Sequence, residues 1–246
     1  MQKVKTGKSN PDALVGKAVH TILEFMLTGR NWETAHGAAA DKHALASDEL
    51  ERVADFRVPV HEFMDKFTRY KERHDISNDI WIEKKLAVDI EGKPVKFFDS
   101  RAFFRGIVDL AMFPRKQKHI IILDHKTGKH RALRYHHNQF NSYLILTKAA
   151  VPDLVQSSTG IHWAKSATVE LNKTPYDVQD IQPYFEQLIS WLNDCTQSTV
   201  NFGETKRGPL CPWCDYRGSC PAFDQGSVIE HVILEKEDGE ATGTNS

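Results

Sequence analysis

Two aspartates and a lysine close neighbouring apolar segments of the chain and could together support metal-dependent chemistry. Asp109 ends the run Arg105–Asp109 (RGIVD), Asp124 ends the apolar run His119–Asp124, and Lys126 follows two residues later. Carboxylate oxygens suit Mg²⁺ or Mn²⁺, and a cation held between them would lower the pKa of a water that attacks a phosphodiester. Lys126 points to the same face of the strand as Asp124, where its ammonium could orient that water. Taken alone, an Asp-x-Lys pair is more commonly a surface ion pair.

Length and composition are those of an ordinary globular protein. The chain has 246 residues, of which 40% are hydrophobic and 26% charged, with a net charge of −1. We expect one large domain, or a domain with a small appendage. Residues 1–10 lack the apolar stretch of a secretory signal, and no run reaches the roughly 20 apolar residues of a membrane span. These features predict an intracellular, cytoplasmic protein that does not enter a membrane.

The spacing of apolar residues predicts an α/β fold with a mixed central sheet flanked by helices. Helical periodicity covers residues 11–29, 47–73 (with a kink or break at Pro59), 135–150 and 176–193, and residues 31–46 read as a loop and a short helix. Strand patterns cover residues 80–90, 101–113, 119–124, 154–164 and 167–171. Residues 1–10 should be a flexible N-terminus, and residues 232–246 a disordered acidic tail.

Four motifs in chain order make the predicted site more specific. They are Gly16-x-x-x-His20 on the first predicted helix, Gly106-x-x-Asp109, the run DHKTG from Asp124 to Gly128, and Gln139-x-x-x-Tyr143 on a later helix. This order and spacing resemble the RecB-like branch of the PD-(D/E)XK nuclease superfamily over about residues 12–220. The resemblance implies a restriction-endonuclease-like core in residues 11–200, with a helical insertion at about 31–75 that forms an N-terminal cover.

The resemblance also implies a role for each matching residue. His20, Asp109 and Asp124 would be metal ligands, and Lys126 the catalytic lysine. The backbone carbonyl of His125 could complete the ligand set and leave positions for water and a phosphate oxygen.

Two further side chains would support the site. Gln139 and Tyr143 would be an accessory pair that contacts DNA and steadies the metal ligands. Glu83 lies where related nucleases often carry an additional acid, but its place in the strand pattern fits an exposed residue equally well.

Positive charge is concentrated directly after the predicted metal site. The residues that carry it are Lys126, Lys129, His130, Arg131, Arg134, His136 and His137. There they could hold backbone phosphates, although such a run is commonly a solvated loop. Phe103, Phe104 and Tyr135 could stack on unpaired bases, with burial in the core as the alternative.

The four cysteines cluster near the end of the chain and suggest metal binding. They are Cys195, Cys211, Cys214 and Cys220. The last three resemble the C-terminal part of the iron–sulfur staple of some RecB-like nucleases, which implies a 4Fe-4S cluster in a cysteine-rich appendage at 201–225. In that family the first ligand precedes the first helix, whereas here no cysteine precedes His20; Cys195 could supply a fourth thiolate. A zinc site and a metal-free segment remain open.

The sequence therefore predicts a Mg²⁺- or Mn²⁺-dependent deoxyribonuclease, an exonuclease on single strands or duplex ends. The resemblance implies a role in recombination, repair or replication, of a phage or mobile-element type, with a helicase or recombination protein as a partner. One alternative is a non-catalytic nucleic-acid-binding or partner-binding module on the same fold, against which the set of Asp109, Asp124 and Lys126 argues. Another is a zinc-stapled phosphoesterase that acts on nucleotides.

Overall fold

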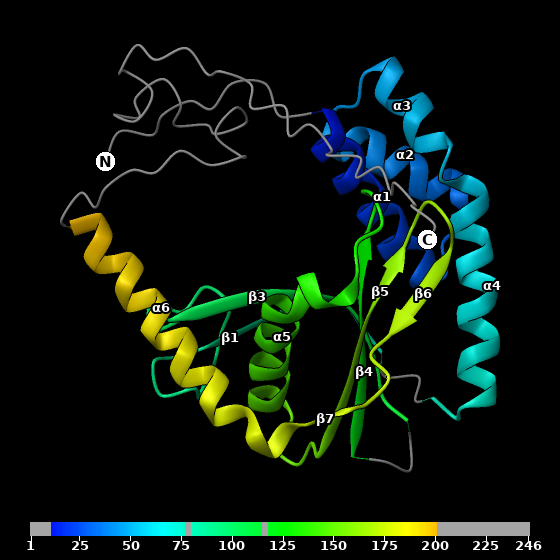
Figure 1. Cartoon of the computed structure of the whole chain (residues 1–246). Coiled ribbons are helices and arrows are strands. Elements are labelled where there is room, and N and C mark those ends of the chain that lie inside the picture. The colour runs from blue at the N-terminus through cyan, green and yellow to red at the C-terminus, as the bar shows by residue number, and fades with distance from the viewer. Residues whose placement is uncertain (1–10, 77–79, 115–117, 201–246) are drawn as a thin grey trace, which may run out of the picture. The chain divides into compact units, whose positions relative to one another are not determined.

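A mixed sheet forms the centre of the protein. The computed structural model describes residues 11–76, 80–114 and 118–200 (Figure 1). The strands within these residues are β1 (Trp81–Val88), β2 (Pro94–Val95), β3 (Phe104–Met112), β4 (His119–Lys126), β5 (Gln156–Trp163), β6 (Thr168–Leu171) and β7 (Tyr176–Asp177). Their order is β2-β1-β3-β4-β5-β6, with β7 also paired to β5. β4 and β5 run parallel and the other pairs antiparallel, which confirms the predicted mixed α/β sheet.

Helices cover both faces of this sheet. They are α1 (Pro11–Leu27), α2 (Trp32–His43), α3 (Ser47–Ala54), α4 (Arg57–Arg73), α5 (His137–Ala150) and α6 (Gln182–Val200), with 3₁₀ turns at Leu133–His136 and Val178–Ile181. One core joins α1–α4 to a sheet face through residues such as Ile22, Phe63 and Leu110. A second core joins α5 to the opposite face through Phe140 and Ile122 (Figure 1). None of the described helices has the length and apolar character needed to cross a membrane.

The N-terminal cover is more helical than predicted. Residues 31–46 were expected to form a loop and a short helix, but α2 runs for 12 residues. The carboxamide oxygen of Asn31 accepts a hydrogen bond from the backbone N–H of Thr34 and so caps the helix. Trp32, Ala35 and Ala39 then face the core. Burial of these apolar side chains stabilises a segment in which the helical spacing of apolar residues is weak.

Two helix boundaries also differ from the prediction. The break expected at Pro59 falls between α3 and α4 at residues 55–56, and Pro59 lies in the first turn of α4. A proline is tolerated there because the N–H groups of a first helical turn have no intrahelical acceptor. The helix predicted from Tyr176 begins only at Gln182, because Tyr176 and Asp177 pair with β5 instead.

Along β1 and β3 the regular alternation of side chains between the two faces of the sheet is interrupted, and this interruption positions the site. The antiparallel register pairs Ile82 with Leu110 and Lys84 with Val108, which places Glu83 on β1 opposite Asp109 on β3. Strict alternation would place Val108 and Leu110 on one face. Instead Leu110 packs in the core beneath α1 and α4, while Val108 packs in the core on the α5 side. Glu83 has a left-handed backbone, with φ 46°, and lies at the point where the alternation is interrupted.

Candidate functional site

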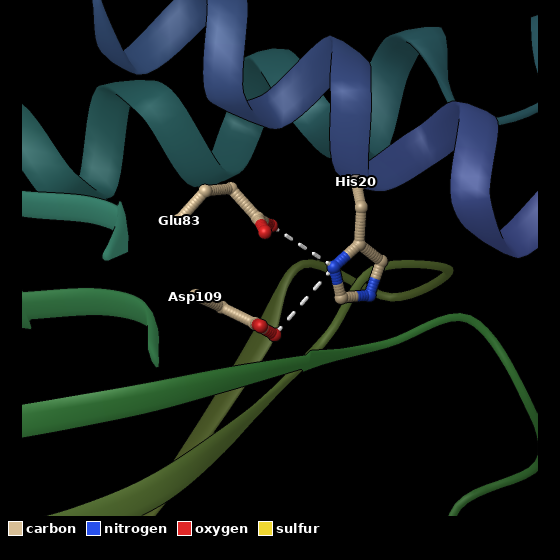
Figure 2. A group of neighbouring side chains, drawn as sticks. All are labelled: His20, Glu83 and Asp109. Atoms are coloured by element: carbon tan, nitrogen blue, oxygen red, sulfur yellow. Dashed lines mark hydrogen bonds and ion pairs between the residues drawn. The ribbon is translucent and has the colours of Figure 1, made fainter. Parts of the chain in front are cut away.

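A histidine and two carboxylates from three elements converge on one point. Nδ1 of His20, on α1, lies 3.4 Å from Oε1 of Glu83 and 3.6 Å from Oδ2 of Asp109 (Figure 2). One potential ligand atom from each of the three lies within 4.8 Å of the other two. Carboxylate oxygens suit Mg²⁺ and Mn²⁺, and an imidazole nitrogen is a further donor that a transition metal such as Mn²⁺ accepts. These three side chains could therefore hold a divalent cation, and we call them the acidic-histidine group.

The backbone of His125 adds a carbonyl oxygen, a potential metal ligand, to this group. Its N–H donates to Oδ2 of Asp109 at 2.8 Å, and its carbonyl oxygen lies 2.9 Å from Nε2 of His20. A carbonyl oxygen only accepts, so Nε2 of His20 carries the proton in this contact. Adjacent ligands of an octahedral Mg²⁺ are about 3 Å apart, given metal–oxygen distances of about 2.1 Å. The carbonyl oxygen and Nε2 are thus spaced as two ligands of one ion would be once the ion has displaced the proton from Nε2.

The backbone of Glu83 is strained. A left-handed conformation in a residue other than glycine costs roughly 1–3 kcal/mol and persists only where the surrounding structure imposes it. Such residues cluster at functional sites. The alternation pattern of the strand left the role of Glu83 open between an acid of the site and an exposed residue; the structure brings its carboxylate to His20.

The acidic-histidine group carries excess negative potential. Burial raises the pKa of Asp109 to about 7, with further contributions from the charges of Asp124 and Glu83, against the opposing effects of His20 and the N–H of His125. For His20, burial lowers the pKa, but the hydrogen bond to Glu83 and the charges of the carboxylates outweigh it and the pKa is raised. A bound cation would replace the protons that this group otherwise attracts.

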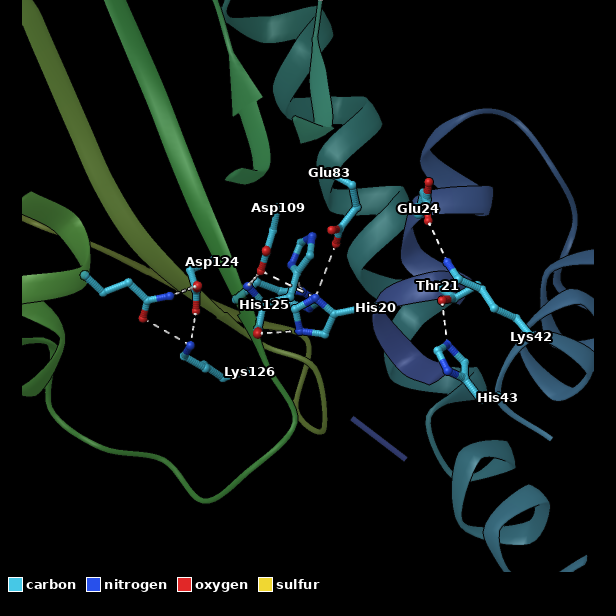
Figure 3. Close-up of polar contacts among 12 residues, drawn as sticks. His20, Thr21, Glu24, Lys42, His43, Glu83, Asp109, Asp124, His125 and Lys126 are labelled. Carbon is cyan, nitrogen blue, oxygen red and sulfur yellow. Dashed lines mark hydrogen bonds and ion pairs between the residues drawn. The ribbon is translucent and has the colours of Figure 1, made fainter. Parts of the chain in front are cut away.

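A second polar group lies on the other side of strand β4. Nζ of Lys126 is 2.7 Å from Oδ2 of Asp124 (Figure 3). It also donates to Oε1 of Gln139 at 3.1 Å. The amide nitrogen of Gln139 and the hydroxyl of Tyr143 donate to Oδ1 of Asp124 at 2.5 and 2.7 Å. Burial, followed by the charges of Asp124 and Asp109, raises the pKa of Tyr143, so its hydroxyl remains a donor. α5 therefore fixes the positions of both Asp124 and Lys126.

The structure brings the residues predicted from sequence into two neighbouring groups. His20 and Asp109 belong to the first with Glu83, and Asp124 and Lys126 belong to the second. Figure 3 places Asp124 beside Asp109 and His125, although the hydrogen bonds and ion pair of its carboxylate oxygens go to the second group. Strand β4 joins the groups.

Gly16 permits α1 to approach the loop after β4. A methyl group at Gly16 would lie 3.1 Å from Oγ1 of Thr127, so a larger residue here would crowd this loop. Behind His20, the hydroxyl of Thr21 lies 3.0 Å from Nε2 of His43 and ties α1 to α2 (Figure 3). A cavity of about 410 Å³, lined in part by Gly16, His20 and Thr127, opens beside the acidic-histidine group.

The other residues proposed from sequence have separate surroundings. Tyr135 is 67% exposed, as a stacking residue requires, whereas Phe104 packs against a core. His130 pairs with Glu170, so part of the basic run is engaged. Cys211, Cys214 and Cys220 lie outside the described residues; Cys195 falls in α6, but its side chain is outside the described part of the chain.

Comparison with known proteins identifies the class. The model of the PD-(D/E)XK nuclease superfamily matches residues 2–221, and this chain belongs to that superfamily. Its class is therefore that of a metal-dependent nuclease, a hydrolase with a nucleic-acid substrate. No curated protein matches the chain. A solved structure described as the crystal structure of SSO0001 is 15% identical, with 89% of this chain and 90% of that chain covered and a TM-score of 0.35.

Proposed function

We propose that the chain is a Mg²⁺- or Mn²⁺-dependent DNA nuclease. The observation that carries this proposal is the adjacency of two groups across residues 124–126: a cluster suited to a divalent cation on one side, and an oriented ammonium on the other. A non-catalytic binding module would have no reason to keep strained Glu83 and a lysine paired to a buried carboxylate.

Each residue has a defined task in this proposal. His20, Asp109 and the carbonyl of His125 would hold the cation, together with Asp124 and, as an addition, Glu83. A carboxylate has about four acceptor positions, so Asp124 can bind an ion and keep the donors from α5. A bound Mg²⁺ or Mn²⁺ would polarise the phosphate and lower the pKa of a water.

Lys126 would act directly on the reacting groups. Its ammonium is held by Asp124 and Gln139, which removes the need to reorganise it during the reaction. From there it can orient the attacking water and stabilise negative charge that develops on the phosphate oxygens. Gln139 and Tyr143 would act by positioning, because both donate to Asp124.

The proposed substrate is DNA, and the proposed reaction is exonucleolytic cleavage of single strands or of duplex ends. A cavity of about 520 Å³ next to the loop after β4 is lined by Thr127, Gly128, Lys129 and Lys165, among others. Its basic side chains could bind the phosphates that flank the scissile bond. A role in recombination, repair or replication of a phage or mobile-element type, with a helicase or recombination protein as partner, is part of the proposal and rests on the family.

A direct experiment tests the reaction and its substrate together. Purified protein is incubated with end-labelled single-stranded DNA, duplex DNA and RNA, with Mg²⁺, with Mn²⁺ or with a chelator. We expect cation-dependent cleavage of DNA with products released from the ends. Equal cleavage with the chelator would reject the metal mechanism, and exclusive cleavage of RNA would reject the substrate.

We further propose that Cys195, Cys211, Cys214 and Cys220 bind a 4Fe-4S cluster. Thiolates are the ligands of such clusters, and the spacing of the last three resembles the staple of related nucleases. Anaerobic purification should yield a coloured protein with stoichiometric iron and sulfide, and replacement of Cys214 by serine should remove both. A colourless protein with stoichiometric zinc would show the alternative site.

A further inference from the structure

An aromatic pair lies on the turn between β2 and β3, with Phe98 exposed and Phe97 half-buried. The side chain of Phe98 is 82% exposed, and the ring of Phe97 meets it edge to face, with centroids 5.1 Å apart and planes at 87°. Large aromatic side chains are ordinarily drawn into a core, so an exposed ring that meets a second ring is a candidate binding surface.

Hydrogen bonds hold this turn in place. Nε of Arg105, on β3, donates to the carbonyl oxygen of Phe97 at 2.5 Å, and Nη2 donates to that of Asp99 at 2.9 Å. The carboxylate of Asp99 in turn accepts bonds from the backbone N–H and the guanidinium of Arg101. The turn therefore presents Phe98 to solvent in a fixed position.

The surroundings of the pair are basic. Nζ of Lys85 lies 5.8 Å from the ring centroid of Phe97 and 5.9 Å from that of Phe98. Residues 84–105 contain six basic and three acidic side chains, whereas the whole chain has a net charge of −1. Two of those acids, Glu91 and Asp99, are paired to Lys93 and Arg101. The remaining positive charge suits a polyanion.

This surface begins next to the acidic-histidine group. Lys85 follows Glu83 by two residues on β1, which corresponds to about 7 Å along a strand. Leu86 and Val88 pack in a core with Ile145 of α5, so Lys85, which alternates with them, lies on the opposite face of the sheet. A strand bound over Lys85 could reach Glu83 within one or two nucleotides.

We propose that Phe97, Phe98 and Lys85 form a stacking platform for unpaired bases of a single-stranded nucleic acid that enters the site. The inference rests on the proposed function and specifies its substrate. Base faces are free to stack on aromatic rings only when the strand is unpaired, whereas the lysine can bind the phosphates of any strand. A protein partner would use the exposed rings but gain little from the surrounding positive charge.

Binding measurements without divalent cation test the platform. Fluorescence anisotropy is measured with a labelled single strand and with the matched duplex, for wild type and for the double variant Phe97→Ala/Phe98→Ala. We expect the double variant to bind the single strand about 10-fold or more weakly, and the duplex within about twofold of wild type. The single variant Phe98→Trp should keep the single-strand affinity of wild type, whereas Phe98→Leu should lose affinity, because stacking requires a flat ring.

Matched controls separate stacking from general surface effects. Val58→Ala removes another exposed apolar side chain, 66% exposed on α4, and should leave single-strand binding unchanged. Lys85→Ala should reduce the salt dependence of single-strand binding, the slope of log K against log salt, by about 0.7, the loss of one phosphate contact. Lys71→Ala on α4 should not change that slope.

The outcomes for the platform and for the nuclease can be told apart. The platform would be overturned if the double variant kept the wild-type melting temperature and bound the single strand within twofold of wild type. Binding of a protein partner would then be the role left for the rings. Equal losses for single strand and duplex would also overturn it. If the platform variants behave as expected but wild type cleaves nothing with Mg²⁺ or Mn²⁺, the platform stands and the nuclease proposal fails.

Discussion

Glu83 and Asp109 stand opposite each other between β1 and β3, and both carboxylates reach the same nitrogen of His20, at 3.4 and 3.6 Å. Residues opposite in an antiparallel pair project to one side, and like charges there destabilise the sheet. Burial raises the pKa of Asp109 to about 7, and the charges of Asp124 and Glu83 add to this effect against the opposing charge of His20. A divalent cation would relieve this repulsion, which gives a physical reason to expect one.

Metal binding should therefore stabilise the folded protein through Glu83. For wild type, Mn²⁺ at about 100 times its dissociation constant should add about 2.7 kcal/mol to the free energy of unfolding. We expect Glu83→Gln to lose most of this gain, because an amide replaces a charged ligand. Thermal denaturation with Mn²⁺ and with a chelator measures it. Glu62→Gln, at an exposed position of α4, should keep the full gain; an undiminished gain in Glu83→Gln would remove Glu83 from the ligand set.

Lys126 and Asp124 should affect cleavage much more than DNA binding. Lys126→Ala removes the oriented ammonium, and Asp124→Ala removes its ion-pair partner. Loss of one such electrostatic group typically lowers kcat about 100-fold or more. DNA affinity measured without divalent cation should stay within a few-fold of wild type, as should cleavage by the control Lys71→Ala. Unchanged hydrolysis in both site variants would reject the mechanism.

The left-handed backbone of Glu83 predicts an unusual order of stabilities. Glycine adopts positive φ without steric cost, whereas alanine retains a penalty of about 1 kcal/mol or more. Urea denaturation should therefore find Glu83→Gly at least as stable as Glu83→Ala. At Lys84, the next strand position, the order should reverse because glycine weakens a regular strand. A Glu83→Gly variant clearly less stable than Glu83→Ala would mean that the strain is absent.

A buried histidine pair beneath the site should make stability fall in mild acid. Nδ1 of His162 lies 2.9 Å from Nδ1 of His125, and the ring of His162 stacks on Phe63 with centroids 3.8 Å apart. Burial, then the charges of His20 and Lys66, lowers the pKa of His162 to about 3. Below pH 6.5 the unfolded chain therefore binds a proton that the folded chain does not, and stability decreases with falling pH.

His162→Phe should flatten this dependence. The loss of stability attributable to His162 approaches about 1.4 kcal/mol per pH unit below pH 6.5, and it disappears with the imidazole. A phenyl ring can keep the stack on Phe63, although the variant should be about 1–3 kcal/mol less stable at pH 7.5 because Nδ1 of His125 loses its partner. Urea denaturation at pH 7.5, 6.5 and 5.5 with a chelator measures this. Parallel curves for variant and wild type would contradict the assignment.

The sequence by itself determined the fold class and the residues at the centre of the site. Periods of 2 and 3.6 are local properties of the chain, so they identified the mixed α/β architecture before any contact was known. The Asp124 to Gly128 run and the spacing of Gln139 and Tyr143 are also local, and they carried the resemblance to the superfamily. The structure brings Lys126, Asp124 and Gln139 together, as the resemblance implied.

The tertiary structure decided what local pattern cannot encode. The role of Glu83 depended on a left-handed backbone and on the strand opposite it, and alternation alone pointed equally to solvent. α2 formed because Ala35 and Ala39 are buried in the core against α1, and Pro59 was accommodated by a helix start just before it. Phe98 is exposed because hydrogen bonds from Arg105, on β3, hold its turn on the surface. The physical reason is common to all of these: a sequence pattern sets which residues share a face, and distant segments set what covers that face.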